Sequence, residues 1–219
     1  MRRLLSLAIA LMLTGPATAA TVRVVDGDTL EVNGTKYRLH GIDAPEAGQK
    51  CRRRGGGSWR CGKAATRALE DLVAGSAVRC DDRGRDDYDR IIAVCHAGET
   101  NLNEAMIRGG HAWAFRKYSM DYVPLEGEAR KDGSGIWQAR TETAWEYRAR
   151  RWQVAKQEAP EGCPIKGNIS RKGVRIYHAP WSPWYSRTKV SVKKGERWFC
   201  SEREALDAGW RAPFWGSRH

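Results

Sequence analysis

The sequence has 219 residues and a formal charge of +12, from 38 Lys and Arg against 26 Asp and Glu. This length suits one large domain or two small ones, and beyond the N-terminus no apolar run is long enough to span a bilayer, which excludes a multi-pass membrane protein. The basic balance favours a polyanionic partner such as nucleic acid, an acidic polysaccharide or anionic lipid headgroups, although a merely basic soluble protein has the same charge.

The N-terminus, residues 1–20, has the pattern of a secretory signal peptide. Two arginines precede an apolar run over residues 4–13, which is too short for a membrane span, and small residues follow it. Cleavage after Ala19 or Ala20 fits equally well. The mature chain is then expected to be periplasmic or secreted, with a charge of +10 and no stable membrane insertion. An uncleaved anchor is the alternative.

The next elements predict a three-stranded meander. Apolar alternation indicates strands over Thr21–Val25 and Thr29–Val32, and Asn33-Gly34 suits the turn into a third strand over Thr35–Ile42. Pro45 ends this run because proline cannot continue a strand ladder.

A Gly- and Arg-rich loop over residues 47–62 follows, and then further helices and strands alternate. Apolar spacing, caps and Gly stops predict them, and Asn101 is the expected cap of the second helix. In chain order they are a helix over Lys63–Ala74, a hairpin of Ser76–Cys80 with Ile91–Cys95, a helix over Asn101–Arg108, a strand over His111–Phe115 and a helix over Val123–Lys131. Five short strands interleaved with helices indicate a small Greek-key barrel with helices packed on it, over residues 21–138.

The remaining sequence predicts a linker helix and a second module. Residues 139–160 are polar, helix-prone and end at Pro160. Residues 161–213 are rich in Lys, Arg, Trp and Tyr, with strand-like runs at Val174–Tyr177 and Arg197–Cys200 and a Ser201-capped helix. This composition indicates a small disulfide-bound α+β module.

Six cysteines in an exported chain favour disulfides over free thiols. Sequence alone does not choose among the possible pairings. We expect neighbours along the chain to pair, because the predicted hairpin places the ends of its two strands side by side. The expected pairs are Cys51–Cys61, Cys80–Cys95 and Cys163–Cys200. A zinc site is the alternative, but no CxxC spacing is present.

Carboxylates crowd the ends of the first hairpin. Asp28 and Asp43 stand at strand ends that the hairpin brings together, and oxygen ligands without His or Cys suit Ca²⁺ or Mg²⁺. Glu46 is placed to orient or deprotonate a water molecule, and Arg38 and Arg90 are candidates to hold one phosphate. The alternative is that these carboxylates belong to ordinary polar turns and that Arg90 is a surface ion-pair partner.

The motifs VVDGDT (24–29), YRLHGIDAPE (37–46), NLNEAMIRGGHAWAF (101–115) and GIW (135–137), together with residues 86–93, resemble the staphylococcal nuclease (thermonuclease) family in order and spacing. The resemblance covers residues 21–138, about half of the chain. It implies an OB-fold barrel, a five-stranded Greek-key barrel with packed helices, and Ca²⁺-dependent cleavage of DNA and RNA phosphodiesters that leaves 3′-phosphates.

The resemblance also implies roles for single residues. Asp28 and Asp43 match the calcium-binding aspartates, and Ala44 stands where a backbone carbonyl binds the metal. Glu46 matches the general base. Arg38 and Arg90 match the two catalytic arginines, and Trp113 and Phe115 match the aromatic pair beside the nucleotide, although these rings serve equally well as core or rim packing.

One position departs from this family: Asp89 stands where a glycine precedes the second arginine. The C-terminal stretches CPIKGNIS (163–170) and GERWFCSEREALDAGWR (195–211) resemble a module of nuclease-like bacterial proteins, some of which are tied by name to succinoglycan biosynthesis. A second hypothesis is therefore a non-catalytic envelope protein that binds anionic polysaccharide through this module. Trp181, Trp184 and Tyr185 are equally suited to stacking on a ligand and to packing. We expect a monomer, and the sequence leaves the choice between DNA and RNA open.

Overall fold

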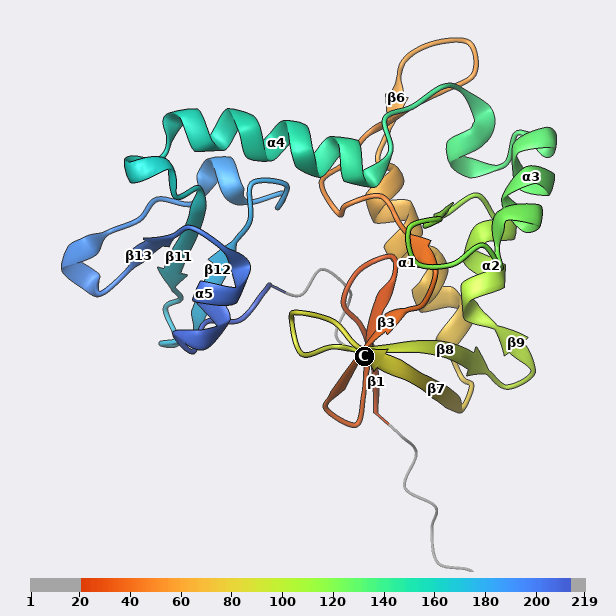
Figure 1. Cartoon of the computed structure of the whole chain (residues 1–219), viewed down its shortest axis with the longest axis horizontal. Helices are drawn as coiled ribbons and strands as arrows, with labels where there is room; N and C mark the ends of the chain where they lie inside the picture. Colours follow the sequence, from red (N-terminus) through yellow and green to blue (C-terminus); the bar gives the residue numbers. More distant parts are fainter. Residues whose placement is uncertain (1–20, 214–219) are drawn as a thin grey trace, which may run out of the picture.

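The computed structural model describes residues 21–213, so the predicted signal peptide and its cleavage sites lie outside the described residues. Two bodies are joined by one long helix, α4 (Ala144–Glu158), which runs along both of them (Figure 1). The larger body is a curled sheet covered by helices, and the smaller is a three-stranded module. Among residues 21–213 no helix combines the length and the apolar character that a membrane crossing needs.

The larger body confirms the expected OB-fold barrel. Its main sheet has the order β1-β2-β3-β8-β7, and β9 pairs with the free part of β8. Strands β3 and β8 run parallel, and the other pairs of this sheet run antiparallel. The bounds are β1 Val22–Val24, β2 Thr29–Val32, β3 Thr35–Leu39, β7 Val78–Arg85, β8 Ile91–Ala97 and β9 Thr100–Asn101.

The expected third strand, Thr35–Ile42, is broken in two, and this corrects the sequence prediction. The chain turns at Gly41, whose φ of 68° suits glycine, and the ring of Tyr122 packs so closely on it that a side chain would not fit. The separate strand β4 (Ile42–Asp43) then pairs with β10 (Trp113–Ala114). This break directs Asp43 back toward Arg38 on β3.

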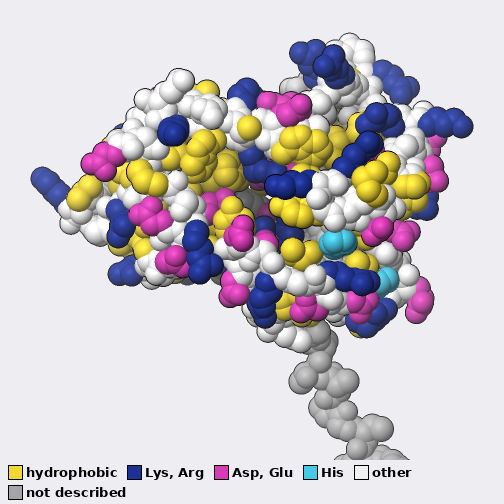
Figure 2. Space-filling model, in the orientation of Figure 1, with side chains coloured by type: hydrophobic (Ala, Val, Ile, Leu, Met, Phe, Trp, Pro, Cys, Tyr) yellow, Lys and Arg dark blue, Asp and Glu magenta, His cyan; other side chains and the backbone are white. Residues whose placement is uncertain are grey.

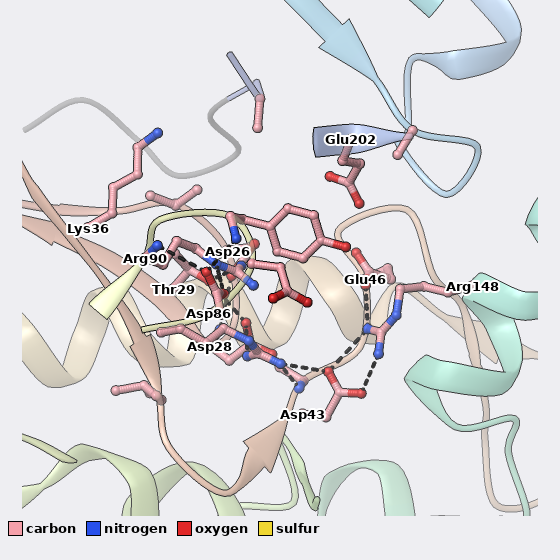
Figure 3. Close-up of a pocket in the computed structure, with 18 of the residues that line it drawn as sticks. Asp26, Asp28, Thr29, Lys36, Asp43, Glu46, Asp86, Arg90, Arg148 and Glu202 are labelled. Carbon is pink, nitrogen blue, oxygen red and sulfur yellow. Dashed lines mark hydrogen bonds and ion pairs between the residues drawn. The ribbon is translucent and has the colours of Figure 1, made fainter. Parts of the chain in front are cut away.

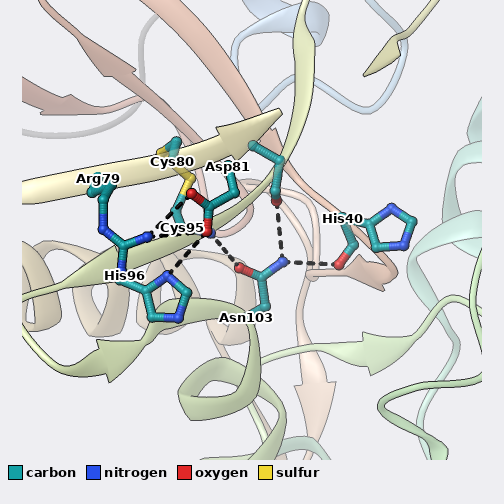
Figure 4. The surroundings of a disulfide bond; sticks show 8 residues. His40, Arg79, Cys80, Asp81, Cys95, His96 and Asn103 are labelled. Atoms are coloured by element: carbon teal, nitrogen blue, oxygen red, sulfur yellow. Dashed lines mark hydrogen bonds and ion pairs between the residues drawn. A yellow bond between two sulfur atoms is a disulfide. The ribbon is translucent and has the colours of Figure 1, made fainter. Parts of the chain in front are cut away.

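Helices α1 (Cys61–Val73) and α2 (Leu102–Arg108) pack on the sheet, and α3 (Val123–Asp132) packs on α2 and β10. Asn101 caps α2 as expected, since its side chain accepts from the backbone N–H of Glu104. The buried Asn103 fixes α2 to the sheet (Figure 4): its side chain accepts from the N–H of Cys95 at 3.1 Å and donates to the carbonyl of His40 at 2.9 Å.

The three disulfides are the expected ones, Cys51–Cys61, Cys80–Cys95 and Cys163–Cys200. The loop over residues 47–62 is more ordered than predicted, because it contains a small hairpin of β5 (Cys51–Arg52) and β6 (Ser58–Trp59). Its disulfide is buried in a second hydrophobic cluster, together with Trp113, Ile136 of the short helix η1 (Gly135–Gln138) and Ala144.

The C-terminal module is an α+β unit, as expected, with the sheet order β12-β11-β13. Its central strand, β11 (Ile165–Ile169), was not predicted; β12 spans Arg175–His178, β13 Arg197–Phe199 and α5 Glu202–Asp207. Short helical turns lie at Pro160–Gly162, Tyr185–Arg187 and Val192–Lys194. Of the three aromatic residues considered for binding, Tyr185 is buried, Trp184 is exposed, and Trp181 packs against Trp152 with the ring centroids 6.1 Å apart.

Candidate active site

A cavity of about 980 Å³ lies where the barrel, α4 and the C-terminal module meet. The barrel lines it with the strand ends of β2 to β4 and with the β7–β8 hairpin. Helix α4 adds Arg148 and Trp152, and the module adds Tyr177, Trp181 and Glu202. Figure 3 shows charged side chains from all three parts directed toward this space. Every charged residue predicted for the site lies on this cavity.

Asp28 is buried and fully engaged in hydrogen bonds and an ion pair. One carboxylate oxygen accepts from the N–H of Ala44 at 2.7 Å, and the other accepts from the Thr29 hydroxyl at 3.2 Å and pairs with Arg38. Burial alone would raise the pKa of this carboxyl, but the Arg38 guanidinium and the Ala44 N–H outweigh burial and lower it. Asp28 is therefore held in its ionised form.

Arg38 links the two aspartates. Its guanidinium pairs with Asp28 and, through Nη2, donates to Oδ1 of Asp43 at 3.0 Å. Burial would lower the pKa of Arg38, but Asp28 and Asp43 together raise it. Asp28 and Asp43, which the sequence predicted to meet around a divalent metal ion, are thus both drawn onto the Arg38 guanidinium.

Glu46 meets a residue that sequence reasoning did not assign to the site. Arg148 of α4 donates through Nη1 to Glu46 at 2.7 Å and to Asp43 at 3.1 Å, and through Nη2 to the other oxygen of Asp43 at 2.7 Å. Burial raises the pKa of Glu46 to about 8, although Arg148 opposes this rise. Residues 139–160 thus do more than link two domains, because α4 completes the carboxylate cluster.

Arg90 is held on the opposite side of the cluster by the β7–β8 hairpin. Its Nε donates to Asp86 at 2.6 Å, and its Nη1 donates to the Thr29 hydroxyl at 3.4 Å, which places it one residue from Asp28. The neighbouring Asp89 adopts a left-handed conformation with φ 60°, a value that aspartate tolerates better than most residues. The turn before Arg90 is therefore formed despite the missing glycine.

Asp26 is a second residue absent from the predicted site set, although it belongs to the motif VVDGDT (24–29). Its carboxylate accepts from the N–H of Asp28 at 3.1 Å and lies on the cavity. Burial, together with the nearby charge of Asp28, raises the pKa of Asp26 to about 7. Gly27 lies between Asp26 and Asp28. It packs so closely on Ala44 and Ala65 that a Cβ at this position would lie within 2.8 Å of both side chains.

The two expected nucleotide-stacking rings occupy different environments. Phe115 lies on the cavity, stacked on Trp145 of α4 with the ring centroids 5.6 Å apart. Trp113 is only 3% exposed and packs edge-on against Trp137 and Trp145 in the second hydrophobic cluster. The structure thus places Trp113 in the core, where it supports the site from behind, and leaves Phe115 accessible to a ligand.

The donor atoms fit a hard divalent cation in kind, since Asp28 and Asp43 offer only oxygens and lie on a common guanidinium. Among residues 21–213, however, no group of three or more Asp, Glu, His or Cys side chains is arranged to hold a metal ion. The carboxylates are instead taken up by Arg38 and Arg148. Ala44 contacts Asp28 through its backbone N–H, and its carbonyl is the group expected to face a metal.

On the face of the molecule shown in Figure 2, charge is dispersed. Lys and Arg side chains lie over both bodies in the face shown in Figure 2, with acidic side chains among them. On this face no single basic patch stands out, so the buried cluster carries the argument about function.

Residues 36–139 match the family described as "Staphylococcal nuclease homologue", and residues 151–212 match the family "ArfC". A "Micrococcal nuclease" of Shigella flexneri is 31% identical over 168 residues, which cover 67% of this chain and 91% of that protein. The chain belongs to the staphylococcal nuclease family.

Two further relatives carry different names. An "Uncharacterized endonuclease" of Escherichia coli is 38% identical over 123 residues, 53% of this chain and 74% of the relative. The "Succinoglycan biosynthesis protein ExoI" of Rhizobium meliloti (strain 1021) is 35% identical over 143 residues, 62% of this chain and 75% of the relative. Arg148 lies between the two matched regions, outside both.

Proposed function

We propose that this protein is an exported, Ca²⁺-dependent nuclease that hydrolyses phosphodiester bonds of DNA or RNA and leaves 3′-phosphate products. The observation that supports it best is the meeting of Asp28, Asp43, Glu46, Arg38 and Arg90 on one cavity. Relatives named endonuclease and micrococcal nuclease support the same reaction class. The three disulfides support an oxidising, non-cytoplasmic location. We further propose that the protein acts as a monomer.

In this proposal the two arginines bind the phosphate from opposite sides of the cluster. Each guanidinium offers several N–H donors in a fixed plane, which suits the oxygens of a phosphoryl group as negative charge builds on them. Arg38 is oriented by Asp28 and Asp43, and Arg90 is oriented by Asp86. The carboxylates thus fix the directions in which the donors point before substrate arrives.

Glu46 is the proposed general base, which takes a proton from the attacking water. Its position depends on Gln49, whose side-chain oxygen accepts from the N–H of Glu46 at 3.1 Å and whose amide donates to the carbonyl of Glu142 at 2.8 Å. Asp28, Asp43 and the Ala44 carbonyl would hold calcium. When bound, calcium supplies two positive charges beside the phosphate. Phe115 is the proposed contact for a base, because stacking on a ring tolerates any sequence.

The test is digestion of plasmid DNA and of RNA by the purified mature protein, with Ca²⁺ and with a chelator. We expect cleavage only with the metal, and fragments that gain a 3′-hydroxyl after phosphatase treatment. Glu46→Gln should lower the rate by about 10²- to 10⁴-fold, as expected for loss of a general base. Glu128→Gln, an exposed carboxylate paired with Arg108, is the matched control. Equal rates for wild type and Glu46→Gln would contradict the proposal.

A second candidate function is binding of an anionic polysaccharide without catalysis. The relative named for succinoglycan biosynthesis favours it, as does the basic C-terminal module. This alternative predicts that the full chain retains polysaccharide and that chelator does not alter retention. No metal-dependent cleavage together with such binding would favour the alternative.

A further inference from the structure

Arg148 binds the same carboxylate oxygens of Asp43 that a metal ion would have to bind. Asp43 is completely buried, with 0% of its surface exposed. Its Oδ1 accepts from both Arg38 and Arg148, and its Oδ2 accepts from Arg148. A buried carboxylate without a partner costs folding free energy, so these two guanidiniums stabilise the buried Asp43 carboxylate.

The two guanidiniums differ in how firmly they are held. Arg38 lies on β3, within the barrel, and bridges Asp28, which directly precedes β2, and Asp43 at the end of β4. Arg148 reaches the cluster from the outer side, from α4, and its side chain is 25% exposed against 14% for Arg38. An arginine cannot give up its charge near neutral pH. Arg148 can therefore release Asp43 only by moving away, and its exposed side provides the path.

We propose that Arg148 is a built-in counter-ion of the carboxylate cluster, which a divalent cation must displace from Asp43 before it can bind there. The inference rests on the proposed calcium-dependent function and names a residue outside both family matches. The cluster of Asp28, Asp43 and Glu46 already holds two guanidinium charges, so a divalent cation enters against their repulsion. Arg148 thus sets how tightly the protein binds its metal.

Calcium binding to chelator-treated protein, measured by titration calorimetry without nucleic acid, tests this inference. Arg148→Gln removes the competing charge and should tighten calcium binding by about tenfold or more. Arg148→Lys keeps the charge and should stay within about threefold of wild type. Arg150→Gln is the matched control, because Arg150 lies on the same helix, pairs with Glu142 at the surface and should leave the affinity unchanged. Unchanged or weaker binding by folded Arg148→Gln would overturn the inference.

A measurement on the wild type covers the case in which Arg148→Gln fails to fold. Arginine side-chain NMR signals, with Arg148 assigned by the Arg148→Lys variant, should show a shift of Arg148 on calcium saturation and no shift of Arg150. A bound metal with an unmoved Arg148 signal would overturn the inference. Calcium-dependent cleavage together with an unchanged Arg148 NMR signal would contradict this inference and leave the nuclease proposal in place. Tighter calcium binding by Arg148→Gln without any cleavage supports it and removes only the nuclease proposal.

Discussion

Gly62, the second residue of α1, lies directly against the backbone carbonyl of Glu46. A Cβ at position 62 would overlap the carbonyl oxygen, and a Cβ at 3.0 Å from the Cα of Ala47 would also be crowded. The atoms that this Cβ would meet are backbone atoms of Glu46 and Ala47, so no side-chain rotation can relieve the overlap. The start of α1 thus fixes the position of the Glu46 backbone, and with it the position of the proposed general base.

We expect Gly62→Ala to push the Glu46 segment away from the cluster and lower kcat by at least about tenfold, since small misplacements of catalytic groups are costly. Steady-state cleavage rates measure the effect. Gly127→Ala is the control: Gly127 is in α3 with open space around it, so alanine there should stabilise the fold by roughly 0.5–1 kcal/mol and leave kcat unchanged. A Gly62→Ala protein with wild-type kcat would show that Glu46 is not held by this contact.

Arg90→Ala should lower kcat by about 10²- to 10³-fold, the usual loss for one donor to a charge that builds in the transition state. Stability should change little, because the Arg90 side chain is 25% exposed and Asp86 keeps its hydrogen bonds from the backbone N–H groups of Tyr88 and Arg90. Arg79→Ala, an exposed arginine on the same hairpin paired with Asp81, is the control for charge loss. If the two variants cleave at equal rates, Arg90 has no special role.

Asp89→Gly tests the departure from the family pattern. The aspartate already adopts the left-handed conformation that glycine prefers, and its carboxylate is 83% exposed. We therefore expect the turn and the position of Arg90 to persist and kcat/KM to rise by less than about threefold, from removal of one screened charge. A gain above about tenfold would mean that Asp89 displaces Arg90 or repels substrate.

The stability of the C-terminal module should depend on pH through His178. Burial, with a contribution from Lys166, lowers the pKa of this side chain to about 4 in the folded protein, below its usual value near 6.5. The unfolded chain then binds the additional proton between these two values. The stability contribution is fully present above pH 6.5 and is lost as the pH falls toward 4.

Denaturant unfolding of the module at several pH values measures this dependence. The His178 ring forms hydrogen bonds through Nε2 to the side-chain oxygen of Asn168 at 2.9 Å and through Nδ1 to the Ser182 hydroxyl at 3.2 Å. In His178→Gln the amide can still donate to Asn168, but it does not titrate. The variant should unfold with a flatter pH profile than wild type. Identical profiles would assign the acid sensitivity to other groups.

Local sequence signals predicted most of the barrel. Strand alternation, the Asn33-Gly34 turn and the Asn101 cap are short-range features, and the structure has the elements they indicate. The break at Gly41 was missed because it depends on the ring of Tyr122, far along the chain. Strand β11 was missed because its run, IKGNI, contains Gly167 and lacks regular alternation.

The predicted acids and arginines do meet on one cavity, while Arg148 was missed for a physical reason. Three arginines lie close together in α4, and local composition does not say which one faces inward. Their spacing carries the information: Ala144 and Ala155 are buried, and Arg148 lies one helical turn after Ala144 on that same face. Trp113 was placed beside the nucleotide by resemblance alone, and only packing shows that it is enclosed.

Helix α4 carries groups for both bodies within a single turn. Arg148 faces the carboxylates, and Arg151 donates to the carbonyl of Pro180 in the module at 2.9 Å. Each residue of an α-helix advances by about 100° around the axis. Loss or gain of one residue between Arg148 and Arg151 would therefore rotate the module around the helix axis relative to the carboxylate cluster. Natural length variation in such proteins should be excluded from this turn and confined to the loops on either side of α4.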